Sequence, residues 1–437
     1  MKNISTIFGA AWLTGALAFN GVPGTGVLRS LFLILGIGHL IWTIRTYNKS
    51  QKWPVHKPES TALLALTLWF VFQSFIFSEI PFESLEAIVT HWGKILLLIF
   101  MMVAFLAYSN NRSATKTWLI FGVFFSGFFH VIATLGYQIH ALTINGGFNI
   151  GMSLFGNYGY ISPYVITSFA ILTADLLCRL TASQRLLPLP TWLIGAFIVL
   201  TLIAQGLLAD KAGYLMSIIL ILISAAIFTF RTHNRKPIVL WISIPVIIVA
   251  MTIPFTFANR WQNGVDAISH FVSHNNDDND VRTAFIGSTD PNHPINNIDA
   301  SFYQRYLWGK AGLHAIASHP YGYGYDSIGF GRFIKETYNI QGAVSSHNGW
   351  IDFAIDNGIP GLFLLLLLTG LIIRRGWQSF TRHHNPAGLV LMFFVINYIG
   401  RCAIDGHLVG SRLTGFAIAT AALWTAISII QNDNQPD

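Results

Sequence analysis

Charged side chains are scarce in this sequence. Asp, Glu, Lys and Arg make up 10% of its 437 residues, against roughly 25% in soluble domains, whereas hydrophobic residues make up 53%. This balance excludes a soluble globular protein and indicates a membrane protein with many spans. The net charge of +7 does not indicate a nucleic-acid-binding protein, because most of the cations fall in short loops between apolar runs, as membrane orientation requires.

Cysteine and the common cofactor motifs are also rare or missing. The two cysteines, Cys178 and Cys402, lie in or beside apolar runs, so there is no disulfide framework or cysteine-based metal cluster to interpret. The sequence lacks a P-loop, a Rossmann glycine pattern, a nucleophile elbow and an HExxH motif, which argues against ATP-driven transport and zinc proteolysis. The acidic residues Asp277, Asp278 and Asp280 lack the ligand spacing and glycine of a calcium loop. No metal and no cofactor is assigned to the chain.

Long apolar runs are what the sequence has instead. A span needs about 20 largely apolar residues, and such runs predict an all-α, polytopic membrane helical bundle without an internal repeat. The first run, Ile7 to Phe19, lacks a cleavage site of small residues, so we interpret it as a membrane helix rather than a signal peptide. The twelve predicted transmembrane helices are 5–20, 27–46, 61–80, 88–108, 116–138, 157–178, 190–208, 212–230, 238–257, 348–373, 386–404 and 409–430.

The basic loops orient these spans. With the N-terminus in the cytoplasm, the loops richest in Lys and Arg all lie inside, which satisfies the positive-inside rule and places both termini in the cytoplasm. The one long polar stretch then lies outside the cytoplasm. We therefore predict spans one to nine in 1–257, an external loop with short helices in 258–346, and spans ten to twelve in 347–437.

The external loop carries recognisable local signals. Apolar residues at helical spacing predict a helix from Ser301 to Ala317, which lies along the membrane surface or packs over the bundle. The glycines and proline of His319 to Tyr325 predict a tight turn. Within the tenth span, Asn-Gly-Ile-Pro-Gly at Asn357 to Gly361 predicts a break in the helix.

His347 is the candidate general base. It lies with Asn348 where the polar loop meets the tenth span, so an imidazole that titrates near neutral pH can meet a substrate held in lipid. The N-terminus of a helix lowers the pKa of a histidine and keeps it neutral. The alternative is a histidine that only hydrogen-bonds to backbone at the interface.

Several cations fall on the predicted outer side, where the positive-inside rule disfavours them, and an anionic ligand would explain their presence. Lys94 lies within the fourth span, where it binds a ligand, snorkels or forms a structural ion pair. Lys211 follows Asp210 in a very short outer turn, and it either contacts a phosphate or pairs with Asp210.

Two arginines complete this set. Arg305 lies on the predicted external helix one turn before Trp308, and its guanidinium suits bidentate phosphate binding, although such a residue is also a common interfacial anchor. Arg412 and Arg401 flank the last outer turn with Asp405 and His407. Either arginine can reach the site, and mutual pairing with the acidic residue and histidine is the alternative.

Taken in order, these motifs resemble the O-antigen ligase family, which shares a domain with O-antigen polymerases and bacterial O-oligosaccharyltransferases. The resemblance is carried by Arg305 followed by an aromatic and Trp308, the turn from His319 to Gly324, and His347-Asn348 with the downstream Gly-Ile-Pro-Gly. It is strongest from Leu207 to Gly361.

The resemblance implies a GT-C-like, metal-independent, inverting glycosyltransferase in the inner membrane of a Gram-negative cell, with its active site facing the periplasm. The implied donor is O-antigen on undecaprenyl pyrophosphate, and the implied acceptor is lipid A-core, in lipopolysaccharide assembly. His347 matches the family's essential periplasmic histidine and Arg305 its arginine before the tryptophan. Lys211 stands where relatives usually have arginine, and Lys94 and Arg412 are further candidates for the pyrophosphate, with Asn348 and Trp308 in support.

Other functions remain open. An O-antigen polymerase tends to have two sizeable external loops, whereas the longest other outer connection here is about 141–156. A protein O-oligosaccharyltransferase usually has a larger external C-terminal portion. A flippase for lipid-linked glycans would need ionisable residues near the midplane, whereas here they gather at the outer edge. These comparisons favour the ligase.

Overall fold

The structure of the protein is a computed structural model. It describes residues 2–46, 57–108, 112–182, 184–231, 282, 285, 300–326, 328–405, 408 and 410–433. The helices are α1 (Lys2–Ala18), α2 (Gly26–Thr46), α3 (Lys57–Ile76), α4 (Pro81–Ala87), the π-helical turn η1 (Ile88–Trp92), α5 (Gly93–Tyr108), α6 (Arg112–Asn145), α7 (Tyr158–Ala182), α8 (Thr191–Leu208), α9 (Lys211–Arg231), α14 (Ala300–Ser318), α15 (Gly329–Tyr338), α16 (Gly349–His383), α17 (Pro386–Cys402) and α18 (Gly410–Asp433).

The all-α polytopic prediction is confirmed. Eight of the described helices are long and apolar enough to cross a membrane, namely α2, α3, α7, α8, α9, α16 and the segments Pro81–Phe105 and Ala114–Asn145. Two more apolar helices, Thr6–Ala18 and α17, are shorter. Described helices overlap eleven of the twelve predicted spans, and the predicted span 238–257 lies outside the described residues.

A small hairpin interrupts the helical architecture on the connection after α6. Strands β1 (Met152–Ser153) and β2 (Gly156–Asn157) pair antiparallel, with Met152 opposite Asn157. Gln138 on α6 holds the hairpin by donating hydrogen bonds from Nε2 to the carbonyls of Asn149 (2.7 Å) and Met152 (2.8 Å). The sequence analysis did not anticipate this hairpin, and α6 extends past the predicted end of the fifth span at residue 138.

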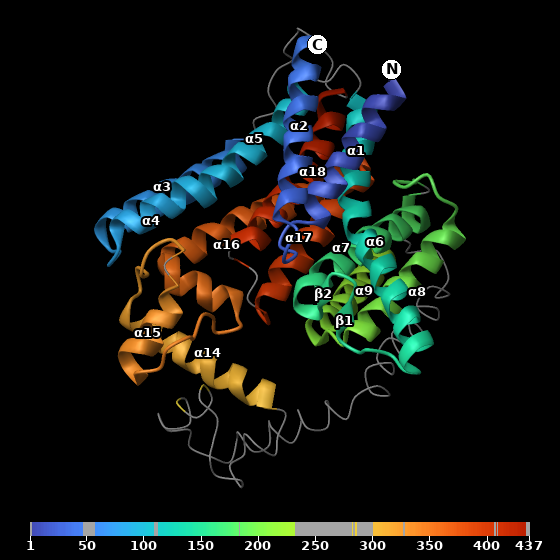
Figure 1. Ribbon diagram of the computed structural model, residues 1–437. Coiled ribbons are helices and arrows are strands. Elements are labelled where there is room, and N and C mark those ends of the chain that lie inside the picture. Colours follow the sequence, from blue (N-terminus) through green and yellow to red (C-terminus); the bar gives the residue numbers. More distant parts are fainter. Residues whose placement is uncertain are drawn as a thin grey trace.

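The bundle is centred on α7 and α17, whose side chains are buried along most of their lengths. In Figure 1 both helices lie in the middle of the molecule, while α14 and α15 lie together below α16, away from the N-terminal end of α1. A continuous apolar cluster joins these central helices to α1, α5, α6 and α18. The central helices therefore hold in place the loops that connect their ends.

α16 has the predicted break. Gly358 has φ 73° and ψ 170°, outside the helical region, and Pro360 follows it. The peptide groups freed by the break find partners elsewhere: Trp69 Nε1 donates to the Asn357 carbonyl (2.8 Å), and Gln73 Nε2 donates to the Asp356 carbonyl (3.0 Å). Buried backbone groups of this kind need partners, so α3 stabilises the broken conformation.

The turn at His319 to Tyr325 packs against the same break. The amide of Gly324 donates to the Asp356 carbonyl and that of Tyr323 to the Ile355 carbonyl, both at 2.9 Å. Gly322 has φ 85°, and a Cβ there would lie 2.4 Å from the amide nitrogen of Gly358. The predicted turn is therefore confirmed, and its glycines are needed for close backbone packing.

The helix predicted from Ser301 to Ala317 is also confirmed, as α14. Its residues Leu307, Ala311 and Ala315 are buried in a second apolar cluster that includes Ile355 of α16 and Phe330 of α15. Of the two placements considered from the sequence, the structure has the helix packed over the bundle. This packing brings α14 to the N-terminal end of α16.

Candidate active site

The backbone around His347 is a tight turn that leads into α16. His347 has φ 58°, and Asn348 is the N-cap of the helix. The Asn348 Oδ1 accepts hydrogen bonds from the amides of Trp350 (3.0 Å) and Ile351 (3.2 Å), as a good N-cap does. Its Nδ2 donates to the carbonyl of Ala403 (2.8 Å). The predicted helix start is confirmed, and it is fixed to the segment after α17.

The imidazole of His347 lies against Trp308. The two ring centroids are 4.9 Å apart and the ring planes differ by 24°, so the rings are stacked. Trp308 belongs to α14, and Arg305 lies one turn before it on the same helix. The predicted helix thus places Trp308 against His347 and Arg305 one turn away, and His347 stays exposed to solvent on its remaining surface.

The surroundings of His347 favour its neutral form. Partial burial lowers the pKa of His347 below its ordinary value, and the positive charges of Arg305 and Arg412 lower it further, while the carboxylates of Asp405 and Asp352 oppose the shift. The net direction is downward. A neutral imidazole can accept a proton at neutral pH.

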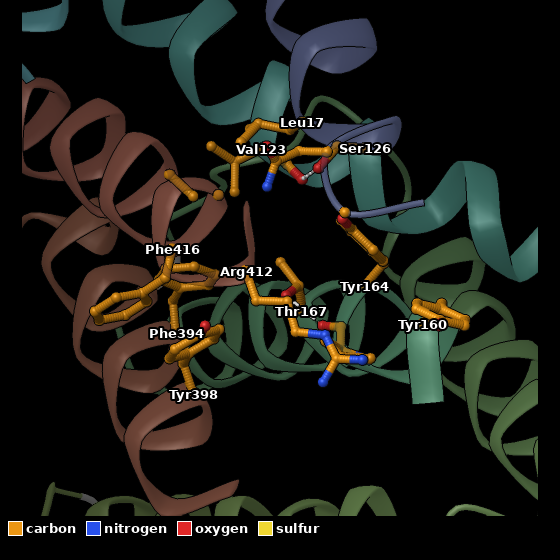
Figure 2. A pocket seen from close by; sticks show the side chains of 15 residues that line it. Leu17, Val123, Ser126, Tyr160, Tyr164, Thr167, Phe394, Tyr398, Arg412 and Phe416 are labelled. Carbon is orange, nitrogen blue, oxygen red and sulfur yellow. Dashed lines mark hydrogen bonds between the residues drawn. The ribbon is translucent and has the colours of Figure 1, made fainter. Parts of the chain in front are cut away.

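Arg412 connects this region to a small cavity in the bundle. Its guanidinium carbon lies 5.5 Å from the ring centroid of Tyr160, a cation–π arrangement. Figure 2 shows the Arg412 side chain extending across a cavity of about 50 Å³, with Tyr398 and Phe416 on one side and Tyr160 on the other. The positive charges of Arg412 and Arg305 both act on His347, so two of the four predicted cations lie within electrostatic range of the candidate base.

Lys94 is linked to this group through a residue that the sequence analysis did not select. Arg29 of α2 is close enough to Lys94 to act on it electrostatically, and Arg29 and Arg412 both act on Tyr164. The sequence did contain a signal for Arg29, because it is one of the cations outside the predicted basic inner loops. Its proximity to Lys94 and Tyr164 requires α2, α5 and α7 to be placed in space.

Lys211 is connected to the site through its neighbour. It begins α9 directly after Asp210, whose Oδ2 lies 2.7 Å from Arg401 Nη1 in a buried ion pair. Arg401 also lies 3.5 Å from the carboxylate of Asp405, and the Asp405 carbonyl accepts a hydrogen bond from Gly349 (3.3 Å). Arg401 is therefore a structural link between the starts of α9 and α16, and it pairs with Asp405 as one sequence interpretation proposed. His407 lies outside the described residues.

An apolar groove adjoins the cationic residues. A cavity of about 160 Å³ is bounded by α3, α5, α16 and α18, and most of its lining side chains are hydrophobic. Ile95 and Leu413, which follow Lys94 and Arg412 in the sequence, line one part of the groove. A hydrocarbon chain in this groove would have positive charge beside it.

A family comparison agrees with this geometry. Residues 196–366 match a family model described as O-antigen ligase. This segment is similar to an O-antigen ligase domain. The matched segment is less than half of the chain, and it includes α14, the start of α16 and the candidate residues Lys211, Arg305 and His347. No curated protein sequence matches the chain.

The match confirms the resemblance to the O-antigen ligase family inferred from Leu207 to Gly361. It supports a glycosyltransferase-like enzyme of the ligase or polymerase type, and with the apolar helices it supports a multi-pass inner-membrane protein. Lys94 and Arg412 lie outside the matched residues. Arg412 acts electrostatically on His347 of the matched segment, whereas Lys94 is linked to Arg29, which also lies outside the match.

Proposed function

We propose that this protein is an O-antigen ligase that transfers O-antigen from undecaprenyl pyrophosphate to lipid A-core at the periplasmic face of the inner membrane. The observation that carries the proposal is the stacking of His347 on Trp308 of α14, one turn from Arg305, where the charges of Arg305 and Arg412 lower the pKa of His347. These groups are a proton acceptor and a set of fixed positive charges. Transfer from a pyrophosphate carrier needs both.

The proposed reaction is a single displacement. A hydroxyl oxygen of the acceptor attacks the anomeric carbon of the donor sugar from the side opposite the pyrophosphate, so the new C–O bond forms as the bond to pyrophosphate breaks and the configuration inverts. His347 accepts the hydroxyl proton. Undecaprenyl pyrophosphate leaves with the bonding electron pair, and the developing negative charge is stabilised by nearby cations.

Four cations are proposed for the pyrophosphate. Arg305 and Arg412 act electrostatically on His347, and Lys94 extends the same positive region through Arg29. Lys211 keeps the positive charge but lacks the fork of an arginine, so we propose a single contact to a phosphate oxygen rather than a bidentate one. Charge stabilisation of this kind is commonly worth about 3 kcal/mol per donor in a water-poor site.

The lipid part of the donor is proposed to occupy the groove among α3, α5, α16 and α18. Its lining is mostly apolar, and two of its lining residues, Ile95 and Leu413, are the sequence neighbours of two of the proposed phosphate ligands, which supports this proposal. A polyprenyl chain bound there would present its pyrophosphate to the cations.

The test is a reconstituted reaction in lipid nanodiscs with a donor of defined sugar sequence and two acceptors, lipid A-core and a second carrier-linked glycan. We expect transfer to lipid A-core, a loss of about 10²- to 10⁴-fold in kcat for His347→Ala, and inversion at the new linkage. His314→Ala is the matched control, since His314 is an exposed histidine of α14 that packs edge-on against Phe333.

Each outcome has a distinct meaning. Near-normal turnover by the His347 variant would remove the histidine from the mechanism. Transfer only to the carrier-linked glycan would identify a polymerase. Movement of the donor across the membrane without a new glycosidic bond would identify a flippase.

A further inference from the structure

The carboxylate of Asp352 is directed at the turn that carries His347. Asp352 lies in the first turn of α16 with 8% of its surface exposed. Its Oδ2 accepts a hydrogen bond from Ser345 Oγ and its Oδ1 accepts one from the amide of Ser346, each at 2.7 Å. Both oxygens are therefore engaged by the two residues that precede His347.

The contact continues to His347 itself. Ser345 Oγ donates its proton to Asp352 and accepts a hydrogen bond from the amide of His347 at 2.9 Å. On the other side, Ser346 Oγ accepts from the amide of Asn348 at 3.2 Å. The backbone amides on both sides of the His347 residue are thus held by serines, and both serines are held by one carboxylate.

The conformation of His347 explains why such support is needed. Its φ of 58° is in the left-handed region, which a residue with a Cβ rarely adopts because the side chain crowds the following carbonyl. A residue stays in this region when the surrounding structure over-determines it. The same backbone conformation aims the imidazole at Trp308 rather than away from α14.

We propose that Asp352 is a positioning residue for His347. The Asp352 carboxylate holds Ser345 and Ser346, Ser345 holds the His347 amide, and this chain of hydrogen bonds fixes the imidazole for proton transfer. The inference rests on the proposed function in one respect, the role of His347 as the base. Asp352 does not touch substrate in this scheme. It acts on the reaction only through the geometry and charge environment of His347.

The charges around His347 give the inference a second, measurable consequence. The groups that act on the imidazole are Arg305 on α14, Arg412 on α18, Asp405 after α17, and Asp352 on α16. Asp352 and Asp405 favour the protonated imidazole and the two arginines disfavour it. Neutralising Asp352 therefore lowers the pKa of His347, whereas a purely structural loss elsewhere leaves it unchanged.

The experiment compares Asp352→Asn with Asp356→Asn in the full-length protein in nanodiscs. Asparagine keeps the size of the side chain, but its NH2 group is a hydrogen-bond donor and replaces one of the carboxylate oxygens that accept from Ser345 and Ser346. Asp356 is also a buried carboxylate of α16, one turn further on, and it accepts from the amide of Gly329 (2.8 Å) instead of the His347 turn. It is the control for the general effect of neutralising a buried acid.

In the transfer assay we expect Asp352→Asn to reduce kcat by about 10- to 100-fold with the donor KM changed by less than about 2-fold, because a displaced base slows chemistry more than binding. Ser345→Ala should reduce kcat in the same direction by a smaller factor, and it remains informative if Asp352→Asn fails to fold. Asp356→Asn should leave kcat per folded molecule within about 2-fold of wild type.

A readout independent of turnover separates this inference from the proposed function. Carbethoxylation of His347 by diethyl pyrocarbonate, followed at that residue by mass spectrometry across a pH series, measures the pKa of its imidazole. We expect the midpoint to move to lower pH in Asp352→Asn and to stay at the wild-type value in Asp356→Asn.

The inference is overturned if Asp352→Asn keeps wild-type kcat and the wild-type His347 midpoint. It is also overturned if its loss of turnover equals the loss of folded protein seen in thermal melting. If the midpoint shifts as expected while His347→Ala is fully active, Asp352 positions the histidine but the histidine is not the base, and only the proposed mechanism fails.

Discussion

Trp308 and His347 lie in different parts of the chain, yet their rings stack with centroids 4.9 Å apart. This contact joins α14 to the turn that precedes the broken helix α16. It limits the orientations open to the imidazole, and it shields one ring face from water. Both effects suit the proposed role of His347 as a base, which must be neutral and aimed at one position.

Replacing Trp308 tests the importance of this contact. We expect Trp308→Ala to lower kcat severalfold, since a stacked ring pair contributes about 1 kcal/mol, and Trp308→Phe to restore much of the loss because a phenyl ring also stacks. The measurement is kcat in the nanodisc transfer assay, with circular dichroism melting to monitor folding. Equal kcat in the wild type and the alanine variant would show that the stacking has no role in turnover.

Arg305 should affect both donor affinity and the pH profile. Its charge lowers the pKa of His347, so Arg305→Gln raises that pKa. Because the base is active when unprotonated, activity is lost as pH falls through the pKa, and the acid limb of kcat/KM should therefore move to higher pH. The donor KM should also rise about 10-fold, as expected for one charge-assisted phosphate contact.

Lys335→Gln is the control for Arg305→Gln, since Lys335 is an exposed cation of α15, which packs in the same apolar cluster as α14. It should change neither the acid limb nor the donor KM. An Arg305 variant whose profile superimposes on that of wild type would place Arg305 among the interfacial anchors, which is the alternative that its sequence context also allowed.

Arg29 is expected to be part of the donor site. It acts on Lys94 and on Tyr164, which lines the same cavity as Arg412. Arg29→Gln should raise the KM for the pyrophosphate-linked donor about 10-fold, which corresponds to about 1.4 kcal/mol, with the acceptor KM unchanged. Arg45→Gln, at the other end of α2, is the matched control and should bind donor normally. A normal donor KM in the Arg29 variant would confine the site to residues near His347.

Much of the local structure was predictable because it depends on neighbours in sequence. Asn348 indicates a helix N-terminus, Gly358 and Pro360 indicate a break in the helix, and the apolar spacing of α14 predicts its buried face. The O-antigen ligase motifs fall on these same segments, so the sequence pointed to Arg305, Trp308 and His347 together.

The parts that were not predictable depend on packing between distant segments. Nothing near Arg29 in the sequence indicates that α2 brings it beside Lys94 of α5, and nothing near Asp210 indicates Arg401 as its partner, 191 residues away. The hairpin after α6 is held by Gln138, whose side chain amide substitutes for longer strand pairing. Such contacts follow from the three-dimensional order of the helices.

The buried pair of Arg401 and Asp210 gives a prediction about stability rather than chemistry. Arg401 is 1% exposed, and Nη1 donates to both Asp210 (2.7 Å) and Ser162 (2.6 Å). Removing one partner leaves the other charge buried without its partner. Arg401→Met or Asp210→Leu alone should therefore destabilise the protein by about 3–5 kcal/mol. The double variant removes both charges and should recover a large part of that loss, because two apolar side chains can occupy the space without an unpaired ion. Unfolding in a graded series of denaturing detergent, analysed as a double-mutant cycle, measures the coupling. Additive losses in the double variant would contradict a coupled pair.

The pair also joins the residue before Lys211 to α17. If the starts of α9 and α16 keep their relative positions without the ion pair, the double variant should have a donor KM near that of wild type.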